Sequence, residues 1–319
     1  LKILSYLLSN QEVCGKRAID YFADKFDDPM MYAQAVKSVS VPTQSILFNI
    51  DIEGPLTKDK TAVLRVFAKM FYNHCGFYGD DLKIAKLERF IEKQGKTQQF
   101  REAFEKVNGA PWTETRDSFA FFEDDIVSVL QSTLGMSEQA ARNWFNGEET
   151  NELSIAQLVA DIQEYVDGKG KDFRLLFMVD EVGQYIGDDG DLMINLQSLV
   201  EEIGIRCHGK VWVMVTSQEA IDSVVHITGN DFSKIQGRFN TRLSLSSSSV
   251  DEVIKKRVLA KTDAADQLLR MVYDKEHAVL KNLYTFNNPV LDIKGFTDGA
   301  EFSATFPFVP VSYTHLTLP

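Results

Sequence analysis

Cysteine is scarce in this sequence. Its 319 residues include three cysteines, Cys14, Cys75 and Cys207, and no two of them stand in C-x-x-C spacing. Small zinc sites and redox motifs use that spacing, and a disulfide framework needs more cysteines. The sequence therefore indicates neither a zinc site nor a disulfide framework, and we expect a reducing, cytoplasmic environment.

Positive charge is also in short supply. The chain has 34 lysines and arginines against 46 aspartates and glutamates, which gives a net charge of -12. This balance argues against wrapping nucleic acid by charge alone, although it leaves a local basic patch open. The 44% hydrophobic and 25% charged residues are ordinary for a soluble globular protein. The length is sufficient for a full core and for more than one domain.

Long apolar runs are missing as well. No run approaches the length that crosses a membrane, and no signal-peptide pattern is present, so we expect no membrane partner. Because the first residue is Leu1 and not methionine, an upstream targeting segment stays open.

Neither end of the sequence resembles a natural end. Residues 1–8 have helical spacing without a start signal, and residues 311–319 resemble the translated read-through of a sequencing adapter. We therefore expect an internal fragment of a longer protein and leave residues 311–319 out of the fold. A second helix is predicted from Cys14 to Phe26, ended by Pro29.

The strongest strand signal in the sequence is an apolar run closed by two carboxylates, from Arg174 to Val182. It predicts a buried parallel strand that ends at the rim of a site. In P-loop NTPases, such a strand places its first acid on Mg²⁺, and a second acid can polarise the attacking water. On this interpretation Asp180 is the Mg²⁺ and cofactor ligand and Glu181 the catalytic base. The alternative is a buried strand that merely ends in acidic loop residues.

Two further apolar runs predict strands in the same sheet, from Thr43 to Asp51 and from Lys210 to Val215. The second run is followed by Thr216, a predicted cofactor-binding residue, and by Gln218. The ends of neighbouring strands can lie side by side at the ligand edge, where Gln218 would contact the γ-phosphate or the attacking water. The alternative role for Gln218 is a helix cap.

Apolar residues recur at helical spacing in the segments between the predicted strands Thr43–Asp51 and Arg174–Val182. This pattern predicts a large all-helical insertion over 55–170. Its aromatic residues predict either the core of this insertion or a surface for a partner or a nucleobase. They are Trp112, Phe119, Phe121, Phe122, Trp144 and Phe145.

Cations follow the predicted strand from Lys210 to Val215. An arginine presented to a neighbouring subunit's nucleotide can stabilise charge on the transferred phosphoryl group. Arg238 is the first candidate and Arg242 the second, with a surface ion pair as the alternative. A short strand over 243–246 and helices from about 250 to 284 are predicted next.

The order of these elements resembles an AAA+ ATPase core. Three segments further resemble the BrxC family of large P-loop proteins from bacteriophage exclusion (BREX) systems: FMVDEVGQYIGDDGDLMINLQSLVEEIG, VWVMVTSQEAID and KIQGRFNTRLSLSSSSVDEVIKKRVLAKT. The resemblance implies an α/β P-loop NTPase fold with NTPase core at 1–54 and 171–246, and a helical lid at 247–310. Asp180 and Glu181 then occupy the Walker B positions, Gln218 a sensor position and Arg238 an approximate arginine-finger position.

The same resemblance implies a bacterial antiphage ATPase that uses ATP and Mg²⁺ and assembles as a homo-oligomer. It would act with other BREX proteins, including a DNA methyltransferase, and contact DNA indirectly. The sequence departs from this pattern because it contains no G-x-x-x-x-G-K-[ST] loop, and Gly15-Lys16 lacks the first glycine and the hydroxyl residue. We therefore expect residues 1–319 alone to be inactive. The alternatives are a non-catalytic scaffold with a degenerate NTPase fold and a DNA-binding module.

Overall fold

A computed structural model describes most of the chain, in two compact units, Leu1–Asn240 and Thr241–Pro319. The described residues are 1–26, 28–55, 57–146, 153–187, 189–217, 239, 241, 243, 254–283 and 296–308.

A parallel sheet of three strands lies at the centre of the first unit. The strands are β3 (Thr43–Asn49), β4 (Arg174–Asp180) and β5 (Val211–Val215), in the order β3-β4-β5. Strand β4 is central, and the five residues from Leu175 to Val179 are fully buried, as an unbroken apolar run predicts. The predicted α/β architecture, a parallel sheet flanked by helices, is confirmed.

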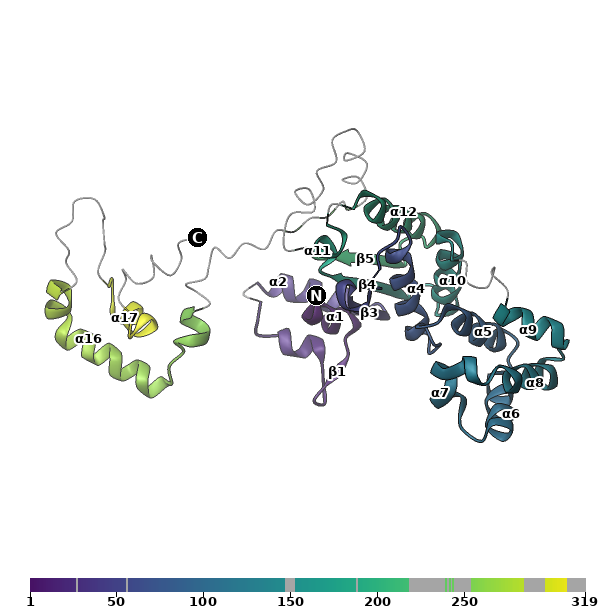
Figure 1. Cartoon of the computed structure of the whole chain (residues 1–319). Coiled ribbons are helices and arrows are strands. Elements are labelled where there is room, and N and C mark those ends of the chain that lie inside the picture. Colours follow the sequence, from purple (N-terminus) through teal and green to yellow (C-terminus); the bar gives the residue numbers. More distant parts are fainter. Residues whose placement is uncertain are drawn as a thin grey trace. The chain divides into compact units, whose positions relative to one another are not determined.

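Helices cover both faces of the sheet (Figure 1). On one face lie α4 (Ala62–His74), α10 (Ile155–Gly168) and α12 (Gly190–Arg206), which share one apolar core with the strands. Within that core the ring of Phe67 in α4 packs 5.5 Å from Phe48 of β3 and 5.3 Å from Phe177 of β4. On the other face, α1 (Lys2–Ser9) contacts β3 through a 2.7 Å hydrogen bond between the Ser5 and Ser45 hydroxyls.

A second core lies within the predicted insertion. It is built by α5 (Leu82–Lys93), α6 (Thr97–Asn108), α7 (Trp112–Thr115), α8 (Glu123–Leu134) and α9 (Glu138–Asn146). Trp112 and Phe145 are buried there, and Phe119, Phe122 and Trp144 pack against them. These aromatics form a core, as one of the two interpretations predicted. Phe121 is the exception, with 86% of its surface exposed.

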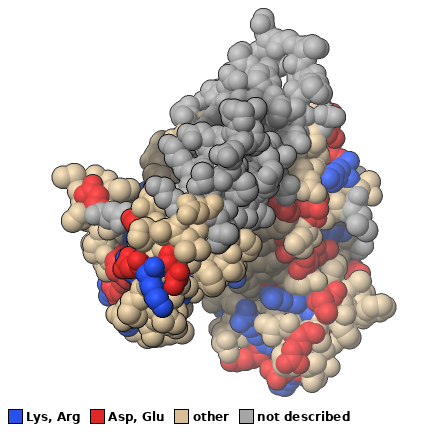
Figure 2. Space-filling view, turned by 90° about the vertical axis from the view of Figure 1, so that its left-hand side faces the viewer, with Lys and Arg blue, Asp and Glu red and all other residues tan. Residues whose placement is uncertain are grey.

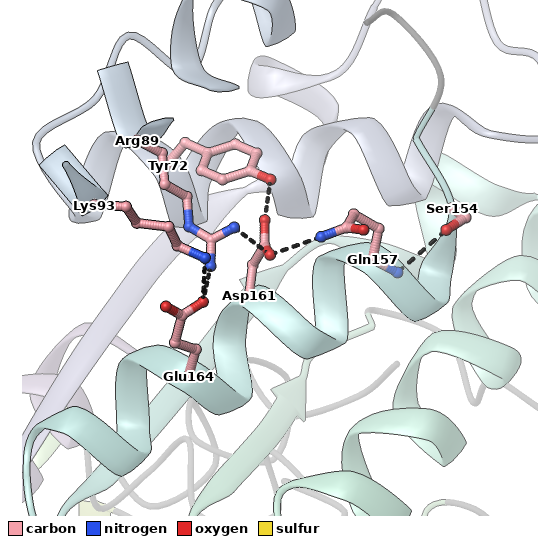
Figure 3. Close-up of polar contacts among 7 residues, drawn as sticks. All are labelled: Tyr72, Arg89, Lys93, Ser154, Gln157, Asp161 and Glu164. Atoms are coloured by element: carbon pink, nitrogen blue, oxygen red, sulfur yellow. Dashed lines mark hydrogen bonds and ion pairs between the residues drawn. The ribbon is translucent and has the colours of Figure 1, made fainter. Parts of the chain in front are cut away.

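A buried polar network joins the second core to helices that cover the sheet (Figure 3). Asp161 of α10 accepts a 2.7 Å hydrogen bond from the Tyr72 hydroxyl of α4 and forms an ion pair with Arg89 of α5. The Gln157 amide donates to the same carboxylate over 2.9 Å. Three helices are therefore connected at one carboxylate whose charge is compensated, which is the condition for burying it.

The predicted helix Cys14–Phe26 is wrong in its first half. Strands β1 (Glu12–Val13) and β2 (Lys16–Arg17) form a hairpin there, followed by the 3-10 helix η1 (Ala18–Phe22). Cys14 and Gly15 have φ of 49° and 77°, and such a left-handed pair makes a tight hairpin turn.

Pro29 begins a helix where the sequence analysis placed only a stop. In α2 (Pro29–Ser38), Asp28 is the N-cap, and its carboxylate accepts a 2.8 Å hydrogen bond from the amide of Met30. Proline suits the first position of a helix because its fixed φ is helical and its missing N–H would have no partner there.

The second unit contains the π-helix η4 (Ile254–Val258), α16 (Asp263–Leu283) and α17 (Gly299–Thr305). The ring of Tyr273 in α16 lies 5.5 Å from Phe302 of α17. The prediction of a helix to about residue 284 is confirmed, whereas most of the predicted strand 243–246 lies outside the described residues. Among the described helices of both units, none is long and apolar enough to span a membrane.

Candidate functional site

The carboxyl ends of the three parallel strands bring polar residues together from distant parts of the chain. Asn49 is paired with Asp180 in the register of β3 and β4, and Thr216 follows β5 directly. The structure therefore places the predicted residues Asp180, Glu181 and Thr216 at one edge of the sheet. In open α/β folds, ligands bind outside this edge.

Thr216 holds the Asp180 carboxylate in place. Its hydroxyl donates a short hydrogen bond to Asp180 Oδ1 and accepts one of 3.3 Å from the amide of Glu181. The backbone of Thr216 is itself fixed, because its amide donates to the carbonyl of Val179 and its carbonyl accepts from Val182, each over 3.0 Å. Asp180 and Thr216 thus form one rigid pair across β4 and β5.

Glu181 has a left-handed backbone, with φ of 61° and ψ of 30°, where α11 (Val182–Ile186) begins. This conformation is strained for any residue other than glycine and costs about 1 to 3 kcal/mol. Such strain persists only where the surroundings enforce it, and it concentrates at functional sites.

Asn49 fixes the Glu181 carboxylate. Its Nδ2 donates a 2.6 Å hydrogen bond to Glu181 Oε2. The other end of the amide, Oδ1, caps α3 (Ile50–Glu53) by accepting from the amides of Asp51 and Ile52 over 2.9 and 3.3 Å. Because Oδ1 is committed to these N–H groups, the donating nitrogen must face Glu181.

Sequence reasoning missed Asn49, although a signal was present. A polar residue that closes an apolar run predicted to lie in the same parallel sheet falls at the same edge as the other strand ends. Gly183 was missed as well: a Cβ at this position would overlap the Ser217 hydroxyl, so a larger residue would force the Ser217 side chain to move.

The other predicted site residues lie outside the described residues. These are Gln218, the predicted sensor, and Arg238 and Arg242, the predicted arginine fingers. Their roles stay predictions.

The donor set at this edge fits a magnesium ion that arrives with a nucleotide. Proteins bind Mg²⁺ through one or two carboxylates, waters and substrate phosphates more often than through an all-protein cage. Asp180 supplies one such carboxylate beside the Thr216 hydroxyl. The described part of the chain has no group of three or more His, Cys, Asp or Glu side chains arranged to hold a metal by themselves.

A phosphate-binding loop lies between a strand and a helix. Neither of the two Gly-Lys pairs that resemble part of such a loop, Gly15-Lys16 and Gly95-Lys96, has this position. Gly15-Lys16 belongs to the β1-β2 hairpin. Gly95-Lys96-Thr97 connects α5 to α6, and Phe90 stands where the first glycine of the motif belongs.

Comparison with known proteins does not identify a family for this chain. No protein-family model matches the sequence, and no solved structure matches the chain. The site must therefore be interpreted from its own residues.

Proposed function

We propose that the edge of the sheet formed by Asn49, Asp180, Glu181 and Thr216 is part of a site for Mg²⁺ and ATP in an AAA+-like P-loop ATPase. The observation that carries this proposal is the pair of adjacent acids held in different ways. In the part of the chain that the structure describes, Asp180 is fixed by a hydroxyl, whereas Glu181 is strained at its backbone and held by one amide. A metal-side acid and a catalytic base need such different environments.

Each residue has a role that follows from its contacts. Asp180 and Thr216 would hold Mg²⁺, which supplies charge neutralisation at the phosphates when bound. Glu181 would accept a proton from the attacking water, and Asn49 would keep its carboxylate in position through Oε2 while Oε1 faces that water. Gln218 and Arg238, with Arg242 as the second candidate, would act on the γ-phosphate and on the transition-state charge.

The biological setting of the proposal rests on the resemblance of three sequence segments to the BREX family. On that basis the parent protein is a cytoplasmic, homo-oligomeric ATPase of antiphage defence. Its turnover is coupled to assembly or to DNA modification and restriction with partners such as a DNA methyltransferase.

A non-catalytic scaffold is the second candidate, and two observations favour it. The sequence has no phosphate-binding loop, and the helical body of α5–α9 presents Phe121 with 86% of its surface exposed. A DNA-binding module is a weaker third candidate. On the face shown in Figure 2, acidic and basic side chains alternate over the described surface without a broad basic patch of the kind that binds phosphates.

Metal binding tests the site directly. Although the proposed site would hold Mg²⁺ most tightly together with a nucleotide, the Asp180 carboxylate should bind a metal ion weakly without one. We therefore expect Mn²⁺, used as a paramagnetic probe for Mg²⁺, to broaden the amide resonances of Asp180, Glu181 and Thr216 before all others in residues 1–319. Asp180→Asn should remove this effect, whereas Asp124→Asn, in the exposed acidic first turn of α8, should leave it unchanged. Broadening confined to α8 would contradict the proposal.

Hydrolysis gives a second test on the same residues. Because the chain has no G-x-x-x-x-G-K-[ST] loop to hold the phosphates, residues 1–319 should neither bind ATP tightly nor hydrolyse it. Strong Mg²⁺-dependent hydrolysis by this chain, abolished by Glu181→Gln, would show that this expectation is wrong.

A further inference from the structure

The two short helices that follow β3 and β4 are packed through a buried tyrosine. Helix α3 contacts α11, and Tyr185 of α11 is 2% exposed. Its ring lies against the backbone of Gly54, directly after α3. A Cβ at Gly54 would come within 2.6 Å of Cε2 and 2.8 Å of the hydroxyl of Tyr185, so this packing requires glycine.

Lys58 lies on the solvent side of the Tyr185 ring and also contacts Tyr185. Its Nζ donates a 2.8 Å hydrogen bond to the carbonyl of Tyr185 and lies 4.1 Å from the centroid of the Tyr185 ring. The cation therefore interacts with both the ring face and a carbonyl in the last turn of α11. Both are favourable places for a positive charge.

These contacts form a closed circuit that begins and ends at Glu181. Its carboxylate accepts from Asn49, which caps α3, and α3 leads to Gly54 and the Tyr185 ring. The amide of Tyr185 returns to Glu181 by donating to its carbonyl over 3.1 Å. The strained residue is thus held through its side chain and its backbone by the same pair of helices.

We propose that Tyr185, held by Gly54 and Lys58, is a positioning residue that keeps Glu181 in reach of Asn49. The catalytic consequence rests on the function proposed above, whereas the mechanical coupling does not. The aromatic ring of Tyr185 makes the contacts with Gly54 and Lys58. Its hydroxyl is buried without a hydrogen-bond partner among the described residues, and burial, followed by the charges of Asp51 and Asp59, raises its pKa.

Two matched pairs of variants separate positioning from simple packing. Tyr185→Leu removes the aromatic face, whereas Tyr185→Phe keeps it and loses only the unpartnered hydroxyl. Lys58→Met removes the cation, whereas Lys58→Arg restores it. Because Lys58 is exposed, its variants keep the proposal testable even if Tyr185→Leu fails to fold.

The readout is the side-chain amide resonance of Asn49 in residues 1–319, identified by its loss in Asn49→Ala. Glu181→Ala gives the position of this resonance without the carboxylate. We expect Tyr185→Leu and Lys58→Met to move it toward that position, and Tyr185→Phe and Lys58→Arg to leave it near wild type. Hydrogen exchange of the peptide spanning α11 should rise about tenfold in Tyr185→Leu and no more than about twofold in Tyr185→Phe.

An Asn49 resonance that stays at its wild-type position in Lys58→Met and in folded Tyr185→Leu would overturn the inference. Neither readout involves a metal or a nucleotide, so the inference and the proposed function can fail separately. If the Asn49 resonance moves in Tyr185→Leu and Lys58→Met but Mn²⁺ has no effect at Asp180, the positioning role is supported and the metal site is contradicted. The reverse result would remove the positioning role alone.

Discussion

The buried acid Asp161 and the strand-end acid Glu181 have different surroundings, and the difference separates structure from chemistry. Asp161 is 4% exposed and receives hydrogen bonds from Tyr72 and Gln157 in addition to its ion pair with Arg89. Among the described residues, one amide hydrogen bond reaches the Glu181 carboxylate, and the Glu181 backbone is strained. A carboxylate whose charge is compensated and whose oxygens all have hydrogen-bond partners stabilises the fold. A carboxylate held at a single oxygen can still take part in a reaction.

Replacing Asp161 tests the structural role. We expect Asp161→Asn to lower the free energy of unfolding by about 2 to 4 kcal/mol, because it leaves Arg89 without its buried partner. The control is Glu164→Gln in the same helix, which removes an acid whose side chain is 54% exposed and should cost less than about 1 kcal/mol. Urea denaturation of both variants measures the difference, and equal losses would contradict the assignment.

The buried thiol of Cys207 predicts an alkaline loss of stability. Burial, together with the charge of Asp167, raises the pKa of Cys207 from 9.0 to about 11. Between these values the unfolded chain loses this proton and the folded chain keeps it, so the free energy of unfolding falls as the pH rises from about 9 to about 11. Chemical denaturation across this range should show a shallower decline for Cys207→Ala than for Cys14→Ala, whose thiol is exposed. Identical slopes would argue against the shift.

At the scale of elements, the strands and the long helices were predictable because each has a strong periodic signal. β4 is an unbroken apolar run, and the predicted strands Thr43–Asp51 and Lys210–Val215 differ from β3 and β5 by one or two terminal residues. Failures occurred where single backbone conformations decide the outcome. The left-handed pair Cys14 and Gly15 turns a helical pattern into a hairpin.

The cap of α12 gives a prediction at this scale. The Asp189 carboxylate accepts hydrogen bonds from the amides of Asp191 and Leu192 over 3.0 and 3.1 Å. Asp189→Ala should therefore lower the free energy of unfolding by about 1 kcal/mol. Asp191→Ala, in the first turn of the same helix, should change the free energy of unfolding by less, because the Asp191 side chain is not the cap. Thermal unfolding that ranks the two variants the other way would contradict the cap.

At the scale of the whole molecule, the site depends on contacts that sequence proximity cannot show. Asn49 and Glu181 are 132 residues apart, and the helices α4–α10 lie between their strands. The sequence identified Asp180, Glu181 and Thr216 because each closes or follows an apolar run. It could not reveal that Asn49 orients Glu181 or that α3 and α11 hold both, because those facts follow from register and packing.

The helical body of α5–α9 has its own core, yet it is joined to the sheet through α4 and α10. Arg89, on the first helix of this body, reaches the buried Asp161 of α10, so the body shares one polar network with helices that cover the sheet (Figure 3). The first unit therefore holds the strand-end residues on a packed support, as the proposed chemistry requires.

If residues 1–319 belong to a longer ATPase, as the resemblance implies, the most direct test of the central claim is the steady-state rate of Mg²⁺-dependent ATP hydrolysis by that longer protein. If Glu181 is the catalytic base, Glu181→Gln should lower kcat by about 10² to 10⁴-fold with little change in KM. Glu105→Gln, on the exposed surface of α6, should match wild type. A Glu181→Gln enzyme that keeps wild-type turnover would contradict the ATPase account and leave the scaffold as the better description.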